Sequence, residues 1–455
     1  MAASPGCRTR TTGKTEPVLP AAIRPPYTRH HDTKADACAR ARYSARPAAH
    51  ALRLAYSSSR KISVIKKSLL PLALGGFGIG MTEFVMMGIL PDIASGLQIT
   101  IPQAGYLITA YALGVVVGAP TLVSLVAGRP PRTVLVWFML MFAIFNAMSA
   151  FAPNFETMMV SRFLAGLPHG AFFGVGAVVA SRLADPGRTA AAVAAIFTGL
   201  TLANVLGVPL GTWIGHTIDW RLVFVIVAAI GVLTMASLRQ WVPHIEPGKR
   251  TGLMQDLKIF RHLDLWLALG IVSIGTGGFF AWFSYIAPLL TDVTRFESTT
   301  IPLIMTVVGI GMTVGVQFGG RLADRVHPLP ALLILMTSMT ALLLCNGWFA
   351  DSKAAMVVLA FLTGANALAI GPPIQMLLIE HAREAEMLGS SLGQSGFNIG
   401  NALGAFLGGI PLTMGFAYTA PQWVAAALAL CGVALSAIML ARHRVQVRAL
   451  ELACK

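Results

Sequence analysis

Charged residues are scarce in this chain: they make up 12% of its 455 residues, whereas soluble globular proteins carry about 25%. Acidic residues are the scarcest, with 19 Asp and Glu against 34 Lys and Arg. Hydrophobic residues reach 55%, and the mean hydropathy is +0.70. This composition excludes an intrinsically disordered protein and argues against a soluble enzyme. It indicates a polytopic membrane protein, which has the lipid bilayer as its surroundings.

The sequence also lacks the parts that most membrane enzymes need. Its five cysteines are scattered without a Cys-x-x-Cys pair, so they predict neither a disulfide framework nor a zinc site. A P-loop lysine motif, a GxSxG elbow and an HExxH motif are all missing. We therefore expect no catalytic residues, no metal and no cofactor. The energy source must be an ion gradient or the gradient of the substrate itself.

The net charge of +15 is concentrated at the N-terminus. Residues 1–68 hold 14 Lys and Arg but only 3 Asp and Glu, which accounts for +11. The high isoelectric point is therefore no sign of nucleic-acid binding. Residues 1–63 contain no apolar run, which excludes a secretory signal. They read as a transit peptide, a basic disordered leader or a mis-assigned start with Val64 as the true initiator, and we favour the last interpretation.

Long uncharged runs alternate with short polar breaks from Leu69 onward, and a membrane-spanning helix needs about 20 apolar residues. The pattern predicts an all-α protein with twelve spans, at 69–91, 103–127, 133–152, 158–181, 190–215, 221–242, 265–290, 299–320, 328–349, 354–379, 387–414 and 420–441. The longest break, 243–264, is the expected cytoplasmic linker between an N-terminal half, 64–242, and a C-terminal half, 265–441. A basic tail, 442–455, follows.

Basic residues gather in alternate loops. One set of loops and the tail hold Arg129, Arg132, Arg182, Arg188, Lys249, Arg250, Lys258, Arg261, Arg321, Arg325, Arg383, Arg442, Arg444 and Arg448, whereas the other loops hold only Arg221, Arg295 and Lys353. By the positive-inside rule the first set is cytoplasmic, so both termini are predicted to lie inside.

The two halves repeat weakly in sequence. Phe163-Leu-Ala-Gly166 recurs as Phe361-Leu-Thr-Gly364, and Asn204-Val-Leu-Gly207 recurs as Asn401-Ala-Leu-Gly404, at offsets of 198 and 197 residues. Parallel six-span repeats predict a major facilitator fold, in which a central cavity lies between the halves.

Two ionisable residues inside the spans are candidates for proton coupling, because a charge at membrane depth is costly unless it is neutralised or paired. Glu83, in the first span, is either a protonation site facing the cavity or a neutral acid with a structural hydrogen bond. Arg162, in the fourth span, heads the row Arg162-x3-Gly166-x3-Gly170 on one helix face. It is either a cation that modulates a carboxylate or an arginine that snorkels to the outer surface.

Seven polar or aromatic side chains are candidate substrate-binding residues, since polar groups in a span face a cavity or another helix. They are His169, Asn204, Trp282, Tyr285, Gln375, Gln394 and Asn398. Gln394 and Asn398 share one helix face with Asn401. The structural alternative is a satisfied core histidine at position 169 and interhelical hydrogen bonds at the others.

Two further segments attract attention. Asp324 and Arg325 end the run from Gly320 after the eighth span, where an acid and two bases form either a charge latch between moving halves or an ordinary basic helix end. Gly207 and Pro209 lie inside the fifth span, where they predict a kinked, close-packed helix or simple small-residue packing.

Several runs together resemble the major facilitator superfamily. They are Gly80-Met-Thr-Glu-Phe84, Gly88-Ile-Leu-Pro91, Ile101-Pro-Gln-Ala-Gly105, Tyr111-Ala-Leu-Gly-Val-Val-Val-Gly-Ala-Pro120, Pro168-His-Gly-Ala-Phe-Phe-Gly174 and the span-five run Gly199 to Gly211. Within that superfamily they are similar to the twelve-span drug:proton antiporters, and Phe280-Ala-Trp-Phe-Ser-Tyr285 is similar to the AraJ-type (arabinose-inducible), sugar-efflux-like subgroup. The resemblance covers about 69–441.

The resemblance implies an alternating-access exporter of the bacterial inner membrane. It implies that Arg162 is the span-four arginine of antiporter proton relays and that Glu83 is the acid of span one. It also implies that Gly207-Val-Pro209 is the antiporter motif, although Val208 splits the usual Gly-Pro pair. The loop motif keeps its acid at Asp324 but not at the matching Ala127, so the first half departs from the family's gating latch.

We therefore predict a secondary active efflux transporter that exchanges protons for a small molecule, namely a drug, a sugar derivative or a metabolite. This fold commonly works as a monomer. One alternative is a facilitator or importer of the same fold, in which Glu83 is structural. Another is a non-transporting membrane receptor, although the longest loop is too short for a signalling domain.

Overall fold

The computed structural model describes residues 66–126, 128–185, 189–246, 261–381 and 386–453. Within these ranges the chain is helical, with no strand. The predicted leader 1–63, Ala127 and the centre of the predicted linker 243–264 lie outside the described residues, so the domain boundaries stay predictions. The described residues up to Arg444 belong to one compact unit, and the end of the last helix, from Val445, belongs to a second.

The N-terminal half contains the elements η1 to α10. Their bounds are η1 Lys67–Leu69, α3 Leu70–Gly88, α4 Leu90–Gly96, α5 Ile101–Leu125, α6 Pro131–Ala150, α7 Phe155–Leu183, α8 Thr189–Leu202, η2 Ala203–Gly207, α9 Val208–Ile214, η3 Gly215–Asp219 and α10 Trp220–Trp241. Of these, η2 and η3 are π-helical segments inside one long helical run.

The C-terminal half contains the elements α12 to α20. Their bounds are α12 Leu263–Gly270, η5 Ile271–Gly275, α13 Thr276–Ser284, α14 Ile286–Pro288, η6 Leu289–Val293, η7 Ser298–Thr300, α15 Ile301–Val326, α16 Pro328–Trp348, α17 Lys353–Ala369, α18 Gly371–His381, α19 Glu386–Thr413 and α20 Ala420–Ala453.

Side chains at several helix starts explain where the chain turns. Thr100 and Gln103 form a capping box that opens α5, in which each side chain hydrogen-bonds the other residue's backbone N–H. The Asn154 side chain accepts the N–H of Thr157 at the start of α7, and Ser352 accepts that of Ala355 in α17. These caps satisfy backbone donors that a helix leaves free at its first turn.

Ten helices in the described part of the chain are long and apolar enough to cross a membrane. One of them, Ala194–Trp241, covers the predicted fifth and sixth spans. It turns at Asp219, which is extended (φ −165°, ψ 132°) and whose side chain accepts the N–H of Arg221. The predicted eleventh span corresponds to α19, which is not among the ten. The all-helical membrane fold is confirmed, and the count of twelve spans stays a prediction.

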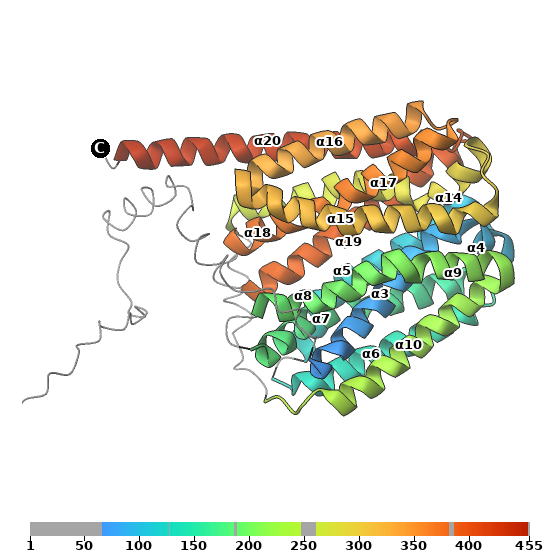
Figure 1. Ribbon diagram of the computed structural model, residues 1–455, viewed down its shortest axis with the longest axis horizontal. Coiled ribbons are helices and arrows are strands. Elements are labelled where there is room, and N and C mark those ends of the chain that lie inside the picture. Colours follow the sequence, from blue (N-terminus) through green and yellow to red (C-terminus); the bar gives the residue numbers. More distant parts are fainter. Residues whose placement is uncertain (1–65, 127, 186–188, 247–260, 382–385, 454–455) are drawn as a thin grey trace, which may run out of the picture. The chain divides into compact units, whose positions relative to one another are not determined.

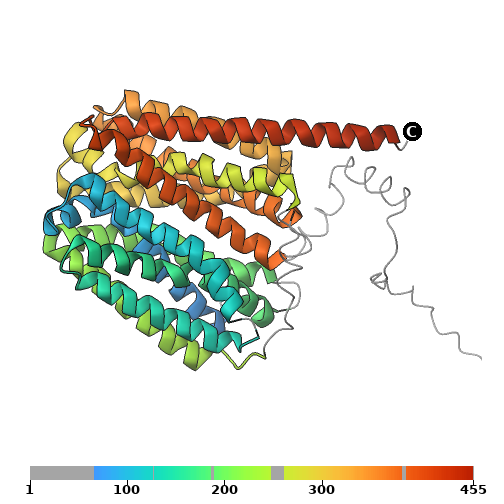
Figure 2. The same ribbon diagram turned by 180° about the vertical axis from the view of Figure 1, so that it is seen from behind.

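The two halves are packed by the same rule. In the N-terminal half α5 packs against α7 and α3 against α8; in the C-terminal half α15 packs against α17 and α13 against α19. Figures 1 and 2 show α3 to α10, coloured blue to green, lying together beside the yellow to orange helices α13 to α19. These pairings join spans 2 and 4, 8 and 10, 1 and 5, and 7 and 11, as an internal repeat requires.

The halves meet along a seam made by α5 against α19 and by α15 against η2 and α9. The Thr109 hydroxyl approaches the Ala402 carbonyl oxygen at 3.4 Å, and the rings of Tyr106 and Phe406 lie 5.9 Å apart. These residues lie toward the ends of α5 and α19 that are predicted to be outside. The seam is thus packed at the predicted outer end in this conformation.

Close helix contact in this fold depends on glycine, and α15 offers a matched test. A side chain at Gly315 would overlap the carbonyl oxygen of Ala365 in α17, whereas one at Gly320 would meet no atom within 4 Å. We expect Gly315→Ala to lower the melting temperature of the purified protein, because α15 and α17 must separate. Gly320→Ala should leave it unchanged or raise it slightly, since alanine favours a helix by about 1 kcal/mol. Equal melting temperatures for the two variants would contradict this account of the packing.

Candidate functional site

Glu83 lies in α3 at the seam between the halves. Its side chain is buried, and the ring of the next residue, Phe84, lies 6.1 Å from that of Phe283 in the C-terminal half. The carboxyl group interacts with the side chain of Asn401 in α19, but the polar atoms of Asn401 lack a partner with hydrogen-bond geometry. Glu83 is therefore a buried ionisable group that faces the other half of the molecule.

Arg162, in α7, is fully buried, so it does not snorkel to the surface. Its Nη1 donates to the Thr82 hydroxyl at 2.9 Å and its Nη2 to the Thr82 carbonyl at 3.1 Å. The guanidinium also lies 4.3 Å from the centre of the Tyr111 ring. Arg162 interacts electrostatically with Glu83, but among the described residues it forms no ion pair within 4.0 Å.

Thr82 and Tyr111, the two residues that contact the Arg162 guanidinium, have further polar partners. The Thr82 hydroxyl donates to Asn146 Oδ1 in α6 at 2.6 Å, and Asn146 Nδ2 donates to the Phe142 carbonyl at 2.8 Å. On the other side, the Tyr111 hydroxyl lies 3.2 Å from His169 Nδ1, and both residues are buried. The structure thus brings together the predicted residues Glu83, Arg162 and His169 through side chains from α3, α5 and α7.

The row of small residues in α7 places Arg162 next to Tyr111. A side chain at Gly166 would overlap the Tyr111 carbonyl oxygen, so glycine at this position lets α7 lie directly against α5. Gly166 is one turn after Arg162, and this close approach brings the guanidinium over the tyrosine ring. Such cation–π contact stabilises a charge that has left water.

Buried polar atoms without a partner among the described residues occur in η2, α13 and α19. The buried atoms without a hydrogen-bond partner among the described residues include Asn204 Nδ2, Trp282 Nε1, Ser284 Oγ, Asn398 Oδ1 and both side-chain polar atoms of Asn401. Such atoms are rare in a finished core, because each costs about 1–3 kcal/mol. Their presence fits groups that bind a ligand or change partners as the protein moves.

The other predicted substrate-binding residues have local partners. The Tyr285 hydroxyl donates to the Ala405 carbonyl at 2.6 Å, and its ring is buried at the seam beside Gly105. Gln394 accepts a hydrogen bond from Asn398 through its backbone carbonyl. Gln375, in α18, lies against Gly393 of α19. Tyr285 therefore packs the seam in this conformation.

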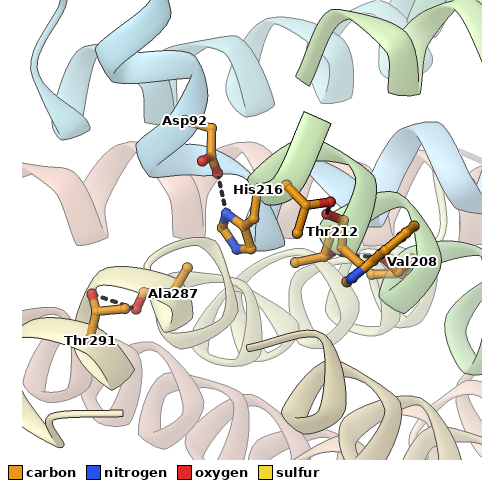
Figure 3. A network of polar contacts seen from close by, with 8 residues as sticks. Asp92, Val208, Thr212, His216, Ala287 and Thr291 are labelled. Atoms are coloured by element: carbon orange, nitrogen blue, oxygen red, sulfur yellow. Dashed lines mark hydrogen bonds and ion pairs between the residues drawn. The ribbon is translucent and has the colours of Figure 1, made fainter. Parts of the chain in front are cut away.

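A close contact between a histidine and a carboxyl group, both half-buried, lies at the predicted outer end of the N-terminal half. His216 Nδ1 in η3 is 2.7 Å from Asp92 Oδ2 in α4, and Figure 3 shows this pair beside Thr212 of α9. The Thr212 hydroxyl donates to the Val208 carbonyl at 2.8 Å. For the imidazole to bind the carboxylate, its Nδ1 must carry a proton. The pair ties the end of span one to the end of span five.

The predicted gating residues fall in two places. Asp324 and Arg325 are exposed at the end of α15, and neither forms an ion pair with another described residue. Gly207 and Pro209 are buried around the junction of η2 and α9. Because Pro209 has no backbone N–H, the helix widens into a π-turn before it. The predicted irregularity of span five is thus present in the structure, and the gating roles stay predictions.

Sequence reasoning missed Thr82, Asn146 and Tyr111 as members of the site. Thr82 precedes Glu83, and Asn146 is a lone polar amide in the third predicted span. Intramembrane polar side chains are informative in general, and this signal was available. Their joint contact with Arg162 depends on helix rotation, which the sequence pattern leaves open.

The family comparison agrees with this architecture. A model of the Major Facilitator Superfamily matches residues 72–404 and 267–451. The chain belongs to this superfamily. It is therefore a multi-pass membrane transporter of small molecules and not an enzyme.

Curated relatives support the same subgroup as the sequence motifs. The putative transporter AraJ of Escherichia coli K12 is 38% identical over 380 residues, which cover 83% of this chain and 95% of AraJ. The inner membrane transport protein YdhP of Escherichia coli O157:H7 is 40% identical over 78% of this chain and 91% of its own length. A chloramphenicol resistance protein of Streptomyces lividans is 29% identical over 78% of this chain and 92% of its own length.

Solved structures share the fold at low identity. The nucleoside transporter NupG (D323A mutant) has a TM-score of 0.65 at 13% identity and covers 83% of this chain and 99% of its own. A D-xylose-proton symporter also has a TM-score of 0.65, at 15% identity, and covers 82% of this chain and 96% of its own. At such identities the likeness concerns the fold alone.

The Thr82 hydroxyl should carry part of the stability of the site. We expect Thr82→Val to lower the free energy of unfolding by about 1–3 kcal/mol, because the buried Arg162 and Asn146 each lose a partner. Thr82→Ser keeps the hydroxyl and should lose less. Unfolding titrations of the purified protein in mixed detergent micelles give both values. If valine and serine proved equally stable, the hydroxyl would not hold the arginine.

His327, between α15 and α16 next to the predicted gating residues, should make stability depend on pH. Partial loss of hydration and the charge of His443, whose ring lies 5.3 Å away, lower the pKa of His327 below its usual 6.5, against the opposing charge of Glu380. The unfolded chain then binds the proton more tightly, so the folded state is favoured above pH 6.5 and loses stability as the pH falls below it.

We expect His327→Asn to reduce the drop in melting temperature between a neutral and an acidic buffer. Asparagine tolerates the left-handed backbone of this residue, where φ is 71°. His244→Asn, at an exposed histidine, is the matched control and should keep the drop of the wild type. An unchanged drop in His327→Asn would remove this residue from the pH response.

Proposed function

We propose that the chain is a proton-coupled efflux transporter of the bacterial inner membrane, with both termini in the cytoplasm. It exchanges protons for a small, partly apolar molecule by alternating access. The single observation that carries this proposal is Glu83, a buried carboxyl group on the seam between the halves. Next to it lies a buried Arg162 that is not ion-paired with it.

Exchange follows from the electrostatics of that pair. An ionised carboxylate within the membrane costs about 2.5–3.5 kcal/mol, so Glu83 must bind a proton or meet a compensating group before the halves close over it. When the molecule is open to the cytoplasm, Glu83 releases its proton and substrate binds. When it is open to the outside, a proton returns to Glu83 as the substrate leaves. The proton gradient then drives export.

The substrate site in this proposal lies between the halves, around Asn204, Trp282 and Asn398, whose side chains have buried polar atoms without a partner among the described residues. Neutral donors and acceptors next to aromatic rings suit an amphipathic molecule with hydroxyl or amide groups. The relative that is named for chloramphenicol resistance makes a phenicol the first compound to test. His169, Tyr285, Gln375 and Gln394 complete the proposed site, and Asp324, Arg325, Gly207 and Pro209 are proposed to take part in gating.

Inverted membrane vesicles energised to be acidic inside test the proposal. Chloramphenicol, lipophilic cations, pentose derivatives and nucleosides are added one at a time, and a pH-sensitive dye reports protons that leave the vesicle. We expect a compound-specific signal in the wild type that is lost in Glu83→Gln. Glu156→Gln, which changes an exposed glutamate at the start of α7, is the matched control and should keep the signal.

A signal that survives Glu83→Gln would keep proton-linked transport but remove Glu83 from it. Substrate uptake without any proton signal would instead favour a facilitator or importer of the same fold. Counterflow of labelled substrate in Glu83→Gln tests whether substrate binding depends on the charge of Glu83. Glutamine resembles the protonated carboxyl group from which the substrate leaves, so we expect counterflow to be weakened in this variant.

A further inference from the structure

We propose that Tyr111 and His169 form a proton relay between Glu83 and the cytoplasmic side of the N-terminal half. The relay rests on the proposed function, because it serves the protonation of Glu83. Neither the composition nor the family match assigns a role to Tyr111. Its hydroxyl lies 3.2 Å from His169 Nδ1, and its ring lies against Arg162, which is hydrogen-bonded to Thr82, the residue before Glu83.

The geometry places the three groups in sequence. The Tyr111 hydroxyl lies 3.2 Å from His169 Nδ1, and both side chains are at most 2% exposed. Among the described residues no hydrogen bond joins Tyr111 directly to Glu83, so the relay requires one bridging water for the first transfer. Arg162 lies over the face of the Tyr111 ring, which leaves the hydroxyl at the ring edge free to transfer protons.

The relay also has a direction. Helix α7 runs from Phe155, at the predicted outer end, to Leu183, at the predicted cytoplasmic end. His169 lies seven residues after Arg162, which is about 10 Å closer to the cytoplasm along the helix axis. One turn further along, the ring of Phe173 lies 5.4 Å from that of His169, and a side chain at the next residue, Gly174, would meet no atom within 4 Å. The relay therefore requires that water reach His169 from the cytoplasmic side, past Phe173.

Each transfer in the relay conserves protons. The carboxyl O–H bond of Glu83 breaks and its proton reaches the Tyr111 oxygen through the water. The tyrosine O–H bond breaks in concert, and that proton forms an N–H bond at His169 Nδ1. The imidazole then gives its Nε2 proton to water on the cytoplasmic side. Tyrosine stays neutral overall, and no oxidant or other reactant is needed.

Infrared spectroscopy can follow the relay without any substrate. The purified protein in detergent is given a proton pulse from a photolabile caged acid, and the carboxylic-acid band of Glu83, assigned by its absence in Glu83→Gln, is recorded against time. In Tyr111→Phe we expect the rate at which the band appears to fall about tenfold or more, while its final amplitude stays the same. The variant loses a positioned proton donor but keeps the ring beneath Arg162. Tyr106→Phe, the same change on the same helix, should match the wild type.

His169→Leu is the second variant, and it should slow the band as much as Tyr111→Phe does. If either variant protonates Glu83 at the wild-type rate, the relay is overturned while Glu83 keeps its proposed role. If the wild type shows no Glu83 band at any pH at which it stays folded, the proton coupling of the proposed function is contradicted, and so is the relay. Slowing in Tyr106→Phe as well would mean that α5 packing, and not the relay, sets the rate.

Discussion

The structure depends on the burial of one arginine away from water without an ion pair among the described residues. Removing Arg162 from water is costly, and the fold offsets this with two hydrogen bonds to Thr82 and the face of Tyr111. These contacts require α3, α5 and α7 to meet at one point. Gly166 makes that possible, because a side chain there would force α7 away from α5. The close packing of α3, α5 and α7 and the stabilisation of the buried charge therefore depend on each other.

Comparison of matching positions in the internal repeat shows how the two halves differ. Asn204 and Asn401 occupy matching positions, and Nδ2 of each has no hydrogen-bond partner among the described residues. Asn401 faces Glu83, whereas the carbonyl oxygen of Asn204 lies against Gly309 of α15, where glycine allows the close approach. Since the matching position of Arg162 is the alanine Ala360, the second half has the same helices but no counterpart of the charged site. The repeat supplies the scaffold, and the chemistry belongs to one half.

The sequence predicted most of the fold because the rules that govern membrane spans are local. Hydropathy located the helices. Glu83 and Arg162 were identifiable because an ionisable residue inside a membrane span is energetically costly. The network around them was not predictable in this way. Whether Thr82 or Tyr111 reaches Arg162 depends on helix rotation and on close approach at Gly166, which are tertiary properties. The π-helical widening before Pro209 was anticipated only as a kink.

The position of Glu83 on the seam explains why protonation and the movement of the halves should be coupled. In this conformation the seam is packed at the predicted outer end, and the ring of Phe84, the residue after Glu83, meets that of Phe283 across it. Among the described residues of the other half, the Asn401 amide is the polar group that would face an ionised carboxylate here. Since Arg162 is held by Thr82 and not by Glu83, it moderates that cost without removing it. The packed seam therefore favours a neutral Glu83, and an ionised Glu83 favours a seam that admits water or substrate.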